Sequence, residues 1–293
     1  MNHIHSLALI VLVMTAVPAG AQPNAATGAR QSSSATLHEL ALRDGSRLYG
    51  AVQKETDREV VFLTQSGTEV TARREDILSL RLVNGSIVNG EFRRADPNAT
   101  RLFFGPTGRA LEQGQVYLGV YEFLLPFVQV GVTDKFSIGG GTPLFFTFDF
   151  DDDEDVSRAY WVTPKLQVFR NSSSAFSVGT FHVFGAGGNG GVAYGVGTFG
   201  RDNGSISLGA GLAYAGADDA AGVFMLGGER RVGRSVKLMT ENYIWKDGKG
   251  VASAGIRFFG ERLSADLALG MPLGVDDFIL FPVVNFVYVF DRR

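Results

Sequence analysis

The sequence predicts an all-β protein: an antiparallel transmembrane β-barrel of about 12 strands, preceded by a small five-stranded β module. Three observations predict this. The chain has 38 Gly, 11% aromatic and only 19% charged residues, a mixture typical of many short strands joined by tight turns. Runs of about 9–13 residues recur from residue 114 onward, the length that a tilted strand needs to cross a bilayer. Several of these runs alternate apolar and polar residues.

Residues 1–21 resemble a secretory signal peptide in their pattern. An apolar segment at 7–17 is followed by Ala19-Gly20-Ala21, a small-residue cleavage pattern, although no Lys or Arg precedes it. A single membrane anchor is the alternative, but the apolar run is short of the ~20 residues that a spanning helix needs. Residues 22–35, rich in Ala and Ser, are expected to be a flexible linker.

The chain has no Cys, which excludes disulfides, thiolate metal sites and a bacterial lipid anchor on Cys. Its net charge of −3 gives no basic field, so no nucleic-acid partner is expected. We expect no cofactor, because no Gly-rich phosphate-binding motif is followed by a helix.

Residues 36–95 form a densely charged segment with five short β runs. The turn pairs Asp44-Gly45, Ser66-Gly67 and Asn84-Gly85 are hairpin signals. The runs are 37–42, 47–53, 59–64, 68–73 and 77–83. The arrangement resembles small Sm-like or SH3-like barrels, which implies a docking or packing module. A periplasmic protein, the cell wall and the barrel itself are the alternative partners.

Residues 96–113 are expected to be a connector, and residues 114–293 the barrel. Eleven long runs follow at 123–132, 136–148, 158–170, 175–186, 191–200, 204–215, 220–232, 235–245, 250–259, 263–271 and 278–290. Bacterial single-chain barrels have an even number of strands, so one more is required. Residues 116–122 are the best candidate, and 101–109 are second.

The alternation is clearest in the run that begins at Leu263. Leu263, Leu267 and Leu269 share one face, while Asp266 and Gly270 lie on the other. An apolar outer face and a polar inner face are the signature of a membrane barrel. Because no apolar run of ~20 residues follows residue 21, a membrane-spanning form of this chain has to use strands.

The segments between the runs predict an orientation. Short turns alternate with longer, acidic segments, and outer-membrane barrels have short periplasmic turns and longer outer loops. We therefore expect the Thr133-Asp134-Lys135 turn and the N-terminal module to lie in the periplasm.

Four stretches resemble uncharacterised Gram-negative outer-membrane barrel proteins: NATRLFF at 98–104, PTGR at 106–109, YLG at 117–119 and GVTDKFSIGGG at 131–141. The resemblance implies an outer-membrane location, with outer-membrane lipid and the barrel assembly machinery as partners. Such barrels usually end in Phe or Trp. Here Phe290 is followed by Asp291-Arg292-Arg293, a departure that affects the assembly signal rather than the strand.

Six charged residues are predicted to face the lumen, because an Arg or Lys facing lipid at mid-bilayer costs ~2–4 kcal/mol. They either line a charged constriction of a pore or form a mutually neutralising network that fills a closed barrel. The sequence does not decide whether the barrel is open or plugged. The six are Lys165, Glu229, Lys237, Glu241, Arg257 and Asp266.

An acidic segment is a candidate loop for a divalent cation. Its carboxylates are Asp149, Asp151, Asp152, Asp153 and Asp155. Their spacing begins like a calcium loop, but Glu154 replaces the required Gly, so an EF-hand is rejected and no metal is assigned. A solvated acidic loop is the alternative.

The predicted function is a narrow channel or a structural, docking membrane protein, without enzymatic activity. A membrane-embedded lipid hydrolase is an alternative from another class, in which His182 would need a nearby activated Ser. No motif supports that triad, and His182 is expected to be an aromatic-belt or wall residue between Phe181 and Phe184. A soluble secreted β-protein is the third alternative.

Overall fold

The computed structural model describes residues 37–88, 90–144, 159–185, 188–201, 203–216, 219–245, 248–275 and 278–290. These residues divide into two compact units, one ending at Ala95 and the other beginning at Asp96. No helix in the described ranges is long and apolar enough to span a membrane. The predicted signal peptide and linker lie outside the described residues.

The first unit is built on an antiparallel sheet with the order β4-β3-β2-β1-β5. Its core contains Leu40, Phe62 and Ala72. All five predicted strands are confirmed, within two residues at either end, whereas the likeness to Sm-like or SH3-like barrels stays a prediction. The strands are β1 (His38–Leu42), β2 (Arg47–Glu55), β3 (Glu59–Thr64), β4 (Glu69–Arg73) and β5 (Ile77–Leu82), with the short 3-10 helix η1 (Arg74–Asp76) before β5.

A two-stranded hairpin, β6 (Gly85–Val88) and β7 (Glu91–Arg94), follows the five-stranded sheet and was not predicted. Its strands have four residues each and begin with Gly and Ser or with Glu, which are poor strand formers. The Asn84-Gly85 pair predicted as a turn is therefore the entry to a further hairpin.

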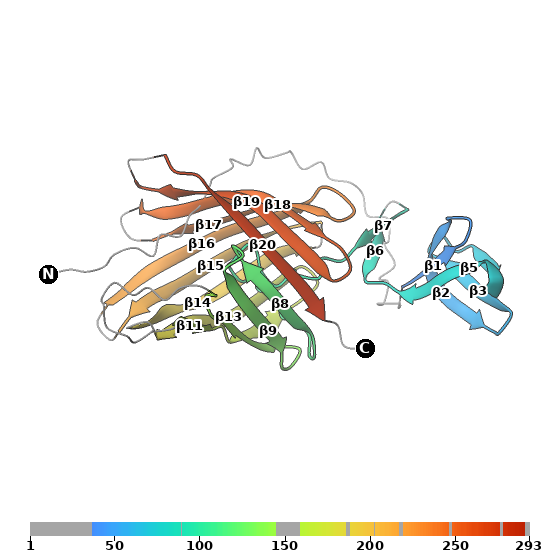
Figure 1. Cartoon of the computed structure of the whole chain (residues 1–293), viewed down its shortest axis with the longest axis horizontal. Helices are drawn as coiled ribbons and strands as arrows, with labels where there is room; N and C mark the ends of the chain where they lie inside the picture. The colour runs from blue at the N-terminus through green and yellow to red at the C-terminus, as the bar shows by residue number, and fades with distance from the viewer. Residues whose placement is uncertain are drawn as a thin grey trace. The chain divides into compact units, whose positions relative to one another are not determined.

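The second unit is a closed antiparallel barrel (Figure 1). Its closure is the pairing of β20 with β8, where Val287 lies opposite Gly119. The strands are β8 (Val116–Tyr121), β9 (Leu125–Gly131), β10 (Phe136–Gly141), β11 (Ala159–Val162), β12 (Lys165–Arg170), β13 (Ser174–Gly185), β14 (Gly188–Arg201), β15 (Gly204–Ala215), β16 (Asp219–Arg231), β17 (Val236–Ile244), β18 (Gly250–Phe259), β19 (Leu263–Leu273) and β20 (Phe281–Phe290).

Two of these labels belong to a single strand position in the barrel. β11 and β12 both pair with β10 on one side and β13 on the other. They are separated at Thr163-Pro164, because proline cannot donate a ladder hydrogen bond. The barrel therefore has twelve strands, and the prediction of 116–122 as the additional strand is confirmed.

Inside and outside alternate along each strand as predicted. In β19, Ser264 and Asp266 are buried, whereas Leu267 and Leu269 are about half exposed. In β12, Lys165 and Gln167 are buried and Leu166 and Val168 are exposed. Along these strands the exposed side chains are thus apolar and the buried ones polar or charged, the reverse of a soluble protein and the pattern of a membrane barrel.

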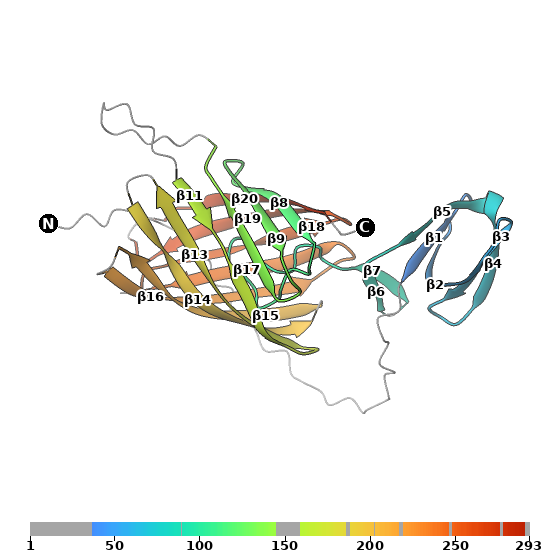
Figure 2. The same cartoon turned by 90° about the horizontal axis from the view of Figure 1, so that it is seen from below.

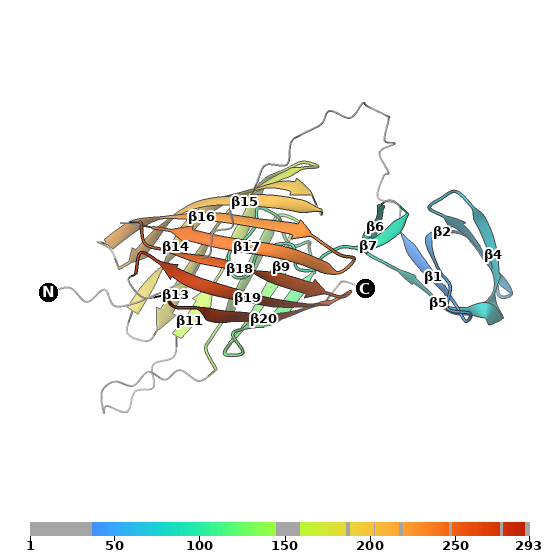
Figure 3. The same ribbon diagram turned by 90° about the horizontal axis from the view of Figure 1, so that it is seen from above.

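The two ends of the barrel differ. We call the end with the β9–β10, β12–β13, β14–β15, β16–β17 and β18–β19 connections the turn end, and the opposite end the loop end. β8 begins and β20 ends at the turn end. Figure 2 shows the wall formed by β13 to β16, and Figure 3 the wall formed by β16 to β20.

Candidate functional site

The lumen is the candidate site, because the segment predicted as a mere connector lies inside it. We call residues 96–113 the plug. Its middle folds back on itself: the Leu102 amide donates to the Gly105 carbonyl at 2.8 Å, and the Thr107 amide to the Thr100 carbonyl at 3.0 Å. Leu102 and Phe103, at the tip of this turn, are fully buried.

Arg257 on β18 anchors the start of the plug. It is completely buried, and its guanidinium binds Asp266 on the neighbouring strand β19 at 2.6 Å. The same group donates to the backbone carbonyls of Asn98, at 2.8 Å, and Leu102, at 2.7 Å. Asp266 also binds Arg101 of the plug at 3.2 Å. A planar guanidinium with five donors is suited to holding an irregular backbone in this way.

A second group of charges joins β16 and β17 to the plug. The Lys237 ammonium lies 3.0 Å from Asp96 of the plug and 2.8 Å from Glu229 on β16. Glu229 in turn binds Arg109 of the plug at 2.6 Å. These ion pairs therefore link the adjacent strands β16 and β17 to each other and to both ends of the plug.

Lys165 and Glu241 bind the plug through its backbone. The Lys165 ammonium donates to the carbonyls of Thr100, Thr107 and Arg109, at 2.7–3.3 Å. Glu241 accepts the amides of Phe104 and Gly105, at 3.0 and 2.9 Å. These contacts satisfy backbone groups that have no partner within regular secondary structure.

Neutral side chains and apolar packing complete the fit. Thr198 accepts the Gly108 amide at 2.8 Å, while Gln167 and Ser177 donate to the Gly108 carbonyl. A Cβ at position 108 would overlap the Ala175 carbonyl, and one at Gly227 would overlap the Leu102 side chain. The plug backbone thus lies directly against the wall, as only glycine permits.

Two apolar clusters hold the plug, one at the tip of its turn and one at Leu111. Leu102 and Phe103 pack on Val196, Met225, Met239, Ala268 and Val283, and Leu111 packs on Tyr117, Phe127, Val287 and Val289. Leu102, Phe103 and Leu111 of the plug are at most 1% exposed as a result.

All six charged side chains predicted to face the lumen are buried inside the barrel, and each of them contacts the plug. Sequence reasoning missed their partners Asp96, Arg101 and Arg109. Four charged residues, these three and Glu112, and the Phe103-Phe104 pair within an 18-residue connector are unusual for a solvated linker. This composition was the one sign in the sequence that the segment is buried. The segment has no strand or helix periodicity, so the sequence did not show where it lies.

His182 lies on the outward face of β13. Its ring packs against Phe184 and Tyr214, and its Nδ1 lies 2.9 Å from the Tyr214 hydroxyl. Tyr160 stacks on Phe184 beside it. The residue is part of an aromatic group near the loop end, as expected for a girdle, and the arrangement does not favour the lipid-hydrolase alternative.

The predicted cation loop, with Asp149, Asp151, Asp152, Asp153 and Asp155, lies outside the described residues. Within the ranges that the structure describes, no group of three or more His, Asp or Glu side chains could hold a metal ion. The expectation of no cofactor stays a prediction.

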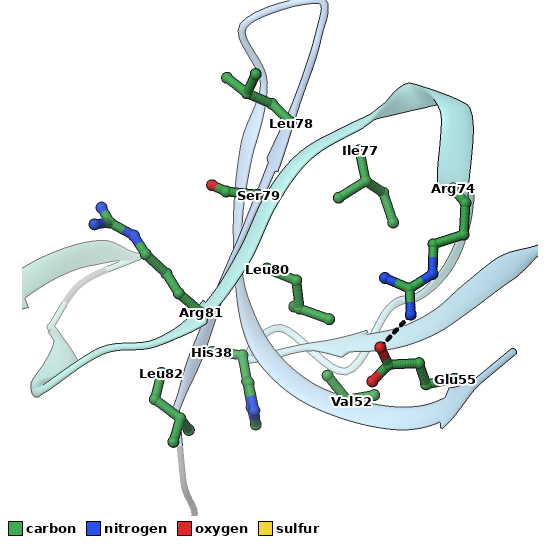
Figure 4. A pocket seen from close by; sticks show the side chains of 10 residues that line it. All are labelled: His38, Val52, Glu55, Arg74, Ile77, Leu78, Ser79, Leu80, Arg81 and Leu82. Atoms are coloured by element: carbon green, nitrogen blue, oxygen red, sulfur yellow. Dashed lines mark hydrogen bonds and ion pairs between the residues drawn. The ribbon is translucent and has the colours of Figure 1, made fainter. Parts of the chain in front are cut away.

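The N-terminal unit has a hollow of about 500 Å³ beside β5 (Figure 4). Val52, Ile77 and Leu80 line it, and the Arg74–Glu55 ion pair closes one side. Two further β5 side chains, Leu78 and Leu82, are 65% and 63% exposed. In the described part of the chain β5 pairs only with β1, so its other edge is free.

The same sheet contains a buried carboxylate, Glu39 on β1, which binds Arg47 at 2.9 Å and Arg81 at 2.5 Å. Burial raises the pKa of Glu39, but hydrogen bonds from the two arginines and a tyrosine hydroxyl outweigh this effect. The pKa therefore lies below its usual range, and the carboxylate stays charged.

No protein-family model and no curated protein matches the chain. Among solved structures, the KdgM porin in complex with disordered oligogalacturonate is similar over 60% of this chain and 98% of that one, at 11% identity and a TM-score of 0.47. OmpT of Vibrio cholerae, an outer-membrane protein in trimer form, is similar over 86% and 95%, at 12% identity and a TM-score of 0.29. Both likenesses concern the fold alone.

Proposed function

We propose that this protein is an outer-membrane β-barrel that its own plug holds closed, with the turn end facing the periplasm. The barrel has the fold of an outer-membrane protein: closed, antiparallel, apolar outside and polar inside. One observation carries the proposal: each of the six lumen charges binds the plug, so none of them is left to line a water-filled pore.

Chain connectivity supports the orientation. Asp96 binds Lys237, near the start of β17, and Arg257, near the end of β18, so the plug enters at the turn end. Short connections are the periplasmic ones in such barrels. Because residue 95 precedes the plug directly, the N-terminal unit belongs to the periplasmic side.

Ion conductance in planar lipid bilayers tests the closure. The intact chain is expected to conduct rarely, and a variant with residues 100–107 replaced by a Gly-Ser segment to conduct at least tenfold more, because the replacement removes the tip of the plug. A heat-dependent shift in gel mobility serves as the control that both proteins form the barrel.

If the replacement variant fails that control, Lys165→Met is used, since it removes three hydrogen bonds to the plug and leaves the sequence of the plug unchanged. Steady conductance of the intact chain, equal to that of a folded plug variant, would contradict the closure.

A second role, docking of a periplasmic protein on the N-terminal unit, is favoured by β5. A free strand edge with two exposed leucines accepts an extended segment of another protein by strand addition. The occupant we propose is such an extended, apolar segment.

Cross-linking in cells tests the docking role. A thiol-reactive cross-linker is expected to join Leu78→Cys on β5 to a defined protein, and Thr71→Cys on the opposite edge strand β4 to give no such product. The captured protein, once purified, should bind the intact chain and lose binding to Leu78→Asp. Equal products from both positions, or unchanged binding to Leu78→Asp, would refute β5 as the docking edge.

A further inference from the structure

The loop-end half of the lumen differs from the half that the plug fills. Contacts with lumen residues show which of its side chains point inward. Tyr194 packs on the cluster around Leu102, and the Tyr243 hydroxyl donates to Glu241. Trp161 packs on the cluster around Leu111, and Phe281 on the cluster around Leu102. Phe181 lies on the same face of β13 as the buried Ser177.

These inward side chains are not covered as those of the turn-end half are. Phe181 remains 38% exposed, whereas Arg257 and Asp266 in the other half are completely buried. Tyr194, Tyr243, Trp161 and Phe281 are each partly exposed, and so is Phe104 at the plug tip. Solvent therefore reaches the inward rings of this half, and Phe104 forms its floor.

The chemistry of this half is apolar and aromatic. Towards the loop end from Glu241, the inward strand positions whose side chains the structure describes include no Asp, Glu, Lys or Arg. Asp219, which pairs with Ala215 at the loop end of β16, is an inward position whose side chain lies outside that description. Phe104 lies 5.2 Å from Tyr121, ring to ring, so the floor and the wall are aromatic together. The Tyr194 hydroxyl lies against Gly179 on the neighbouring strand β13.

We propose that the loop-end half of the lumen binds a neutral, largely apolar small molecule with a flat ring face. Apolar surface is driven out of water onto these rings, and ring faces stack on aromatic side chains. Binding sites of this kind are mostly apolar, with a few polar groups that orient the ligand. The inward side chains that the structure describes in this half supply no counter-charge for a charged ligand.

A binding site here goes beyond closure of the barrel but rests on it for its floor, Phe104 of the plug; binding and conductance are separate measurements, so each can fail without the other. The chain has only two Trp residues, and both belong to this region. Trp161 is on the inward face, and Trp245 packs with Tyr243 against Val251. Tryptophan fluorescence therefore reports directly on this half of the lumen.

The test is energy transfer from tryptophan to N-phenyl-1-naphthylamine, a neutral, apolar fluorescent probe, with the full chain in lipid nanodiscs. A saturable component above that of empty nanodiscs is expected. Naphthalene is expected to displace the probe, and maltose and galacturonate are not. The absence of a saturable component would overturn the proposal, and displacement by maltose but not by naphthalene would overturn the ligand class.

Matched variants locate the site. Val223→Arg places a charge on the inward face of β16, and should weaken probe binding at least tenfold. Val223→Thr keeps the shape of the natural valine and adds no charge, so its probe affinity should stay within threefold of that of the natural chain. Should Val223→Arg fail the heat-dependent gel shift, Ala213→Arg on β15 replaces it, where the long side chain reaches water at the loop end. Unchanged binding by a folded Arg variant would contradict this location.

Discussion

The two halves of the lumen are walled by the same strands, yet one is charged and filled and the other is apolar and partly open. In the turn-end half, Lys165, Lys237 and Arg257 are buried against the plug. In the loop-end half, inward rings such as Phe181 keep contact with solvent. The difference shows that the buried charged residues of this barrel lie where the plug contacts the wall, and not where the lumen is exposed to solvent.

The physical reason lies in the plug backbone. An irregular segment buried in a barrel brings amides and carbonyls that no ladder satisfies, and each unsatisfied group is costly. Arg257 and Lys165 donate to six of these carbonyls, three each, in addition to their other contacts, and Glu241 accepts two amides. An unfilled half needs no such donors, so its wall can be apolar.

Arg257→Met should have the largest effect on stability. It leaves Asp266 and Asp96 without their shared partner and frees three plug carbonyls. Removal of one member of a buried ion pair costs about 3–5 kcal/mol. Urea unfolding in lipid vesicles measures the loss, and Arg257→Lys should fall between this variant and the natural chain. A loss of unfolding free energy below about 1 kcal/mol would show that the charged half of the lumen does not depend on this contact with the plug.

Glu241→Gln should have an intermediate effect. The carboxylate accepts the Phe104 and Gly105 amides with two different oxygens, and a glutamine has only one acceptor oxygen. A hydrogen bond to a charged group contributes about 1.5–3 kcal/mol, and that range is the expected loss in the same unfolding measurement. An unchanged midpoint would mean that the plug tip does not rest on this residue.

Val223→Thr, in the loop-end half, should have the smallest effect. Its side chain is only partly buried, and substitutions at solvated positions usually stay within about 0.5 kcal/mol. The same denaturation series provides the value. A loss as large as that of Glu241→Gln would indicate that this half is packed like the other, and would erase the distinction between them.

Much of the barrel could be predicted from the sequence because each strand repeats a simple rule. The runs at 204–215 and 250–259 coincide with β15 and β18, and alternation placed all six lumen charges inside. The break at Pro164 was not predicted, because the alternation of apolar and polar residues continues across it, from Val162 to Leu166 and Val168. The ladder ends there for lack of an amide hydrogen.

The plug could not be predicted in the same way. Residues 96–113 have no period, and their place is fixed by contacts with β12, β13, β14 and β16 to β20, far along the chain. The sequence left a filled lumen and a charged constriction as alternatives. Only the positions of Asp96, Arg101 and Arg109 decide between them, and those depend on tertiary structure.

Disulfide cross-linking tests most directly whether the plug occupies the lumen. The chain has no cysteine, and Gly227 lies against the Leu102 side chain inside the barrel. Leu102→Cys with Gly227→Cys should form an intramolecular disulfide in isolated outer membranes, seen as a gel shift that reductant reverses. Leu102→Cys with Gly228→Cys, one residue along on the outward face, should form none. The contrary result, equal cross-linking of both pairs or of neither, would show that residues 96–113 do not fill the barrel.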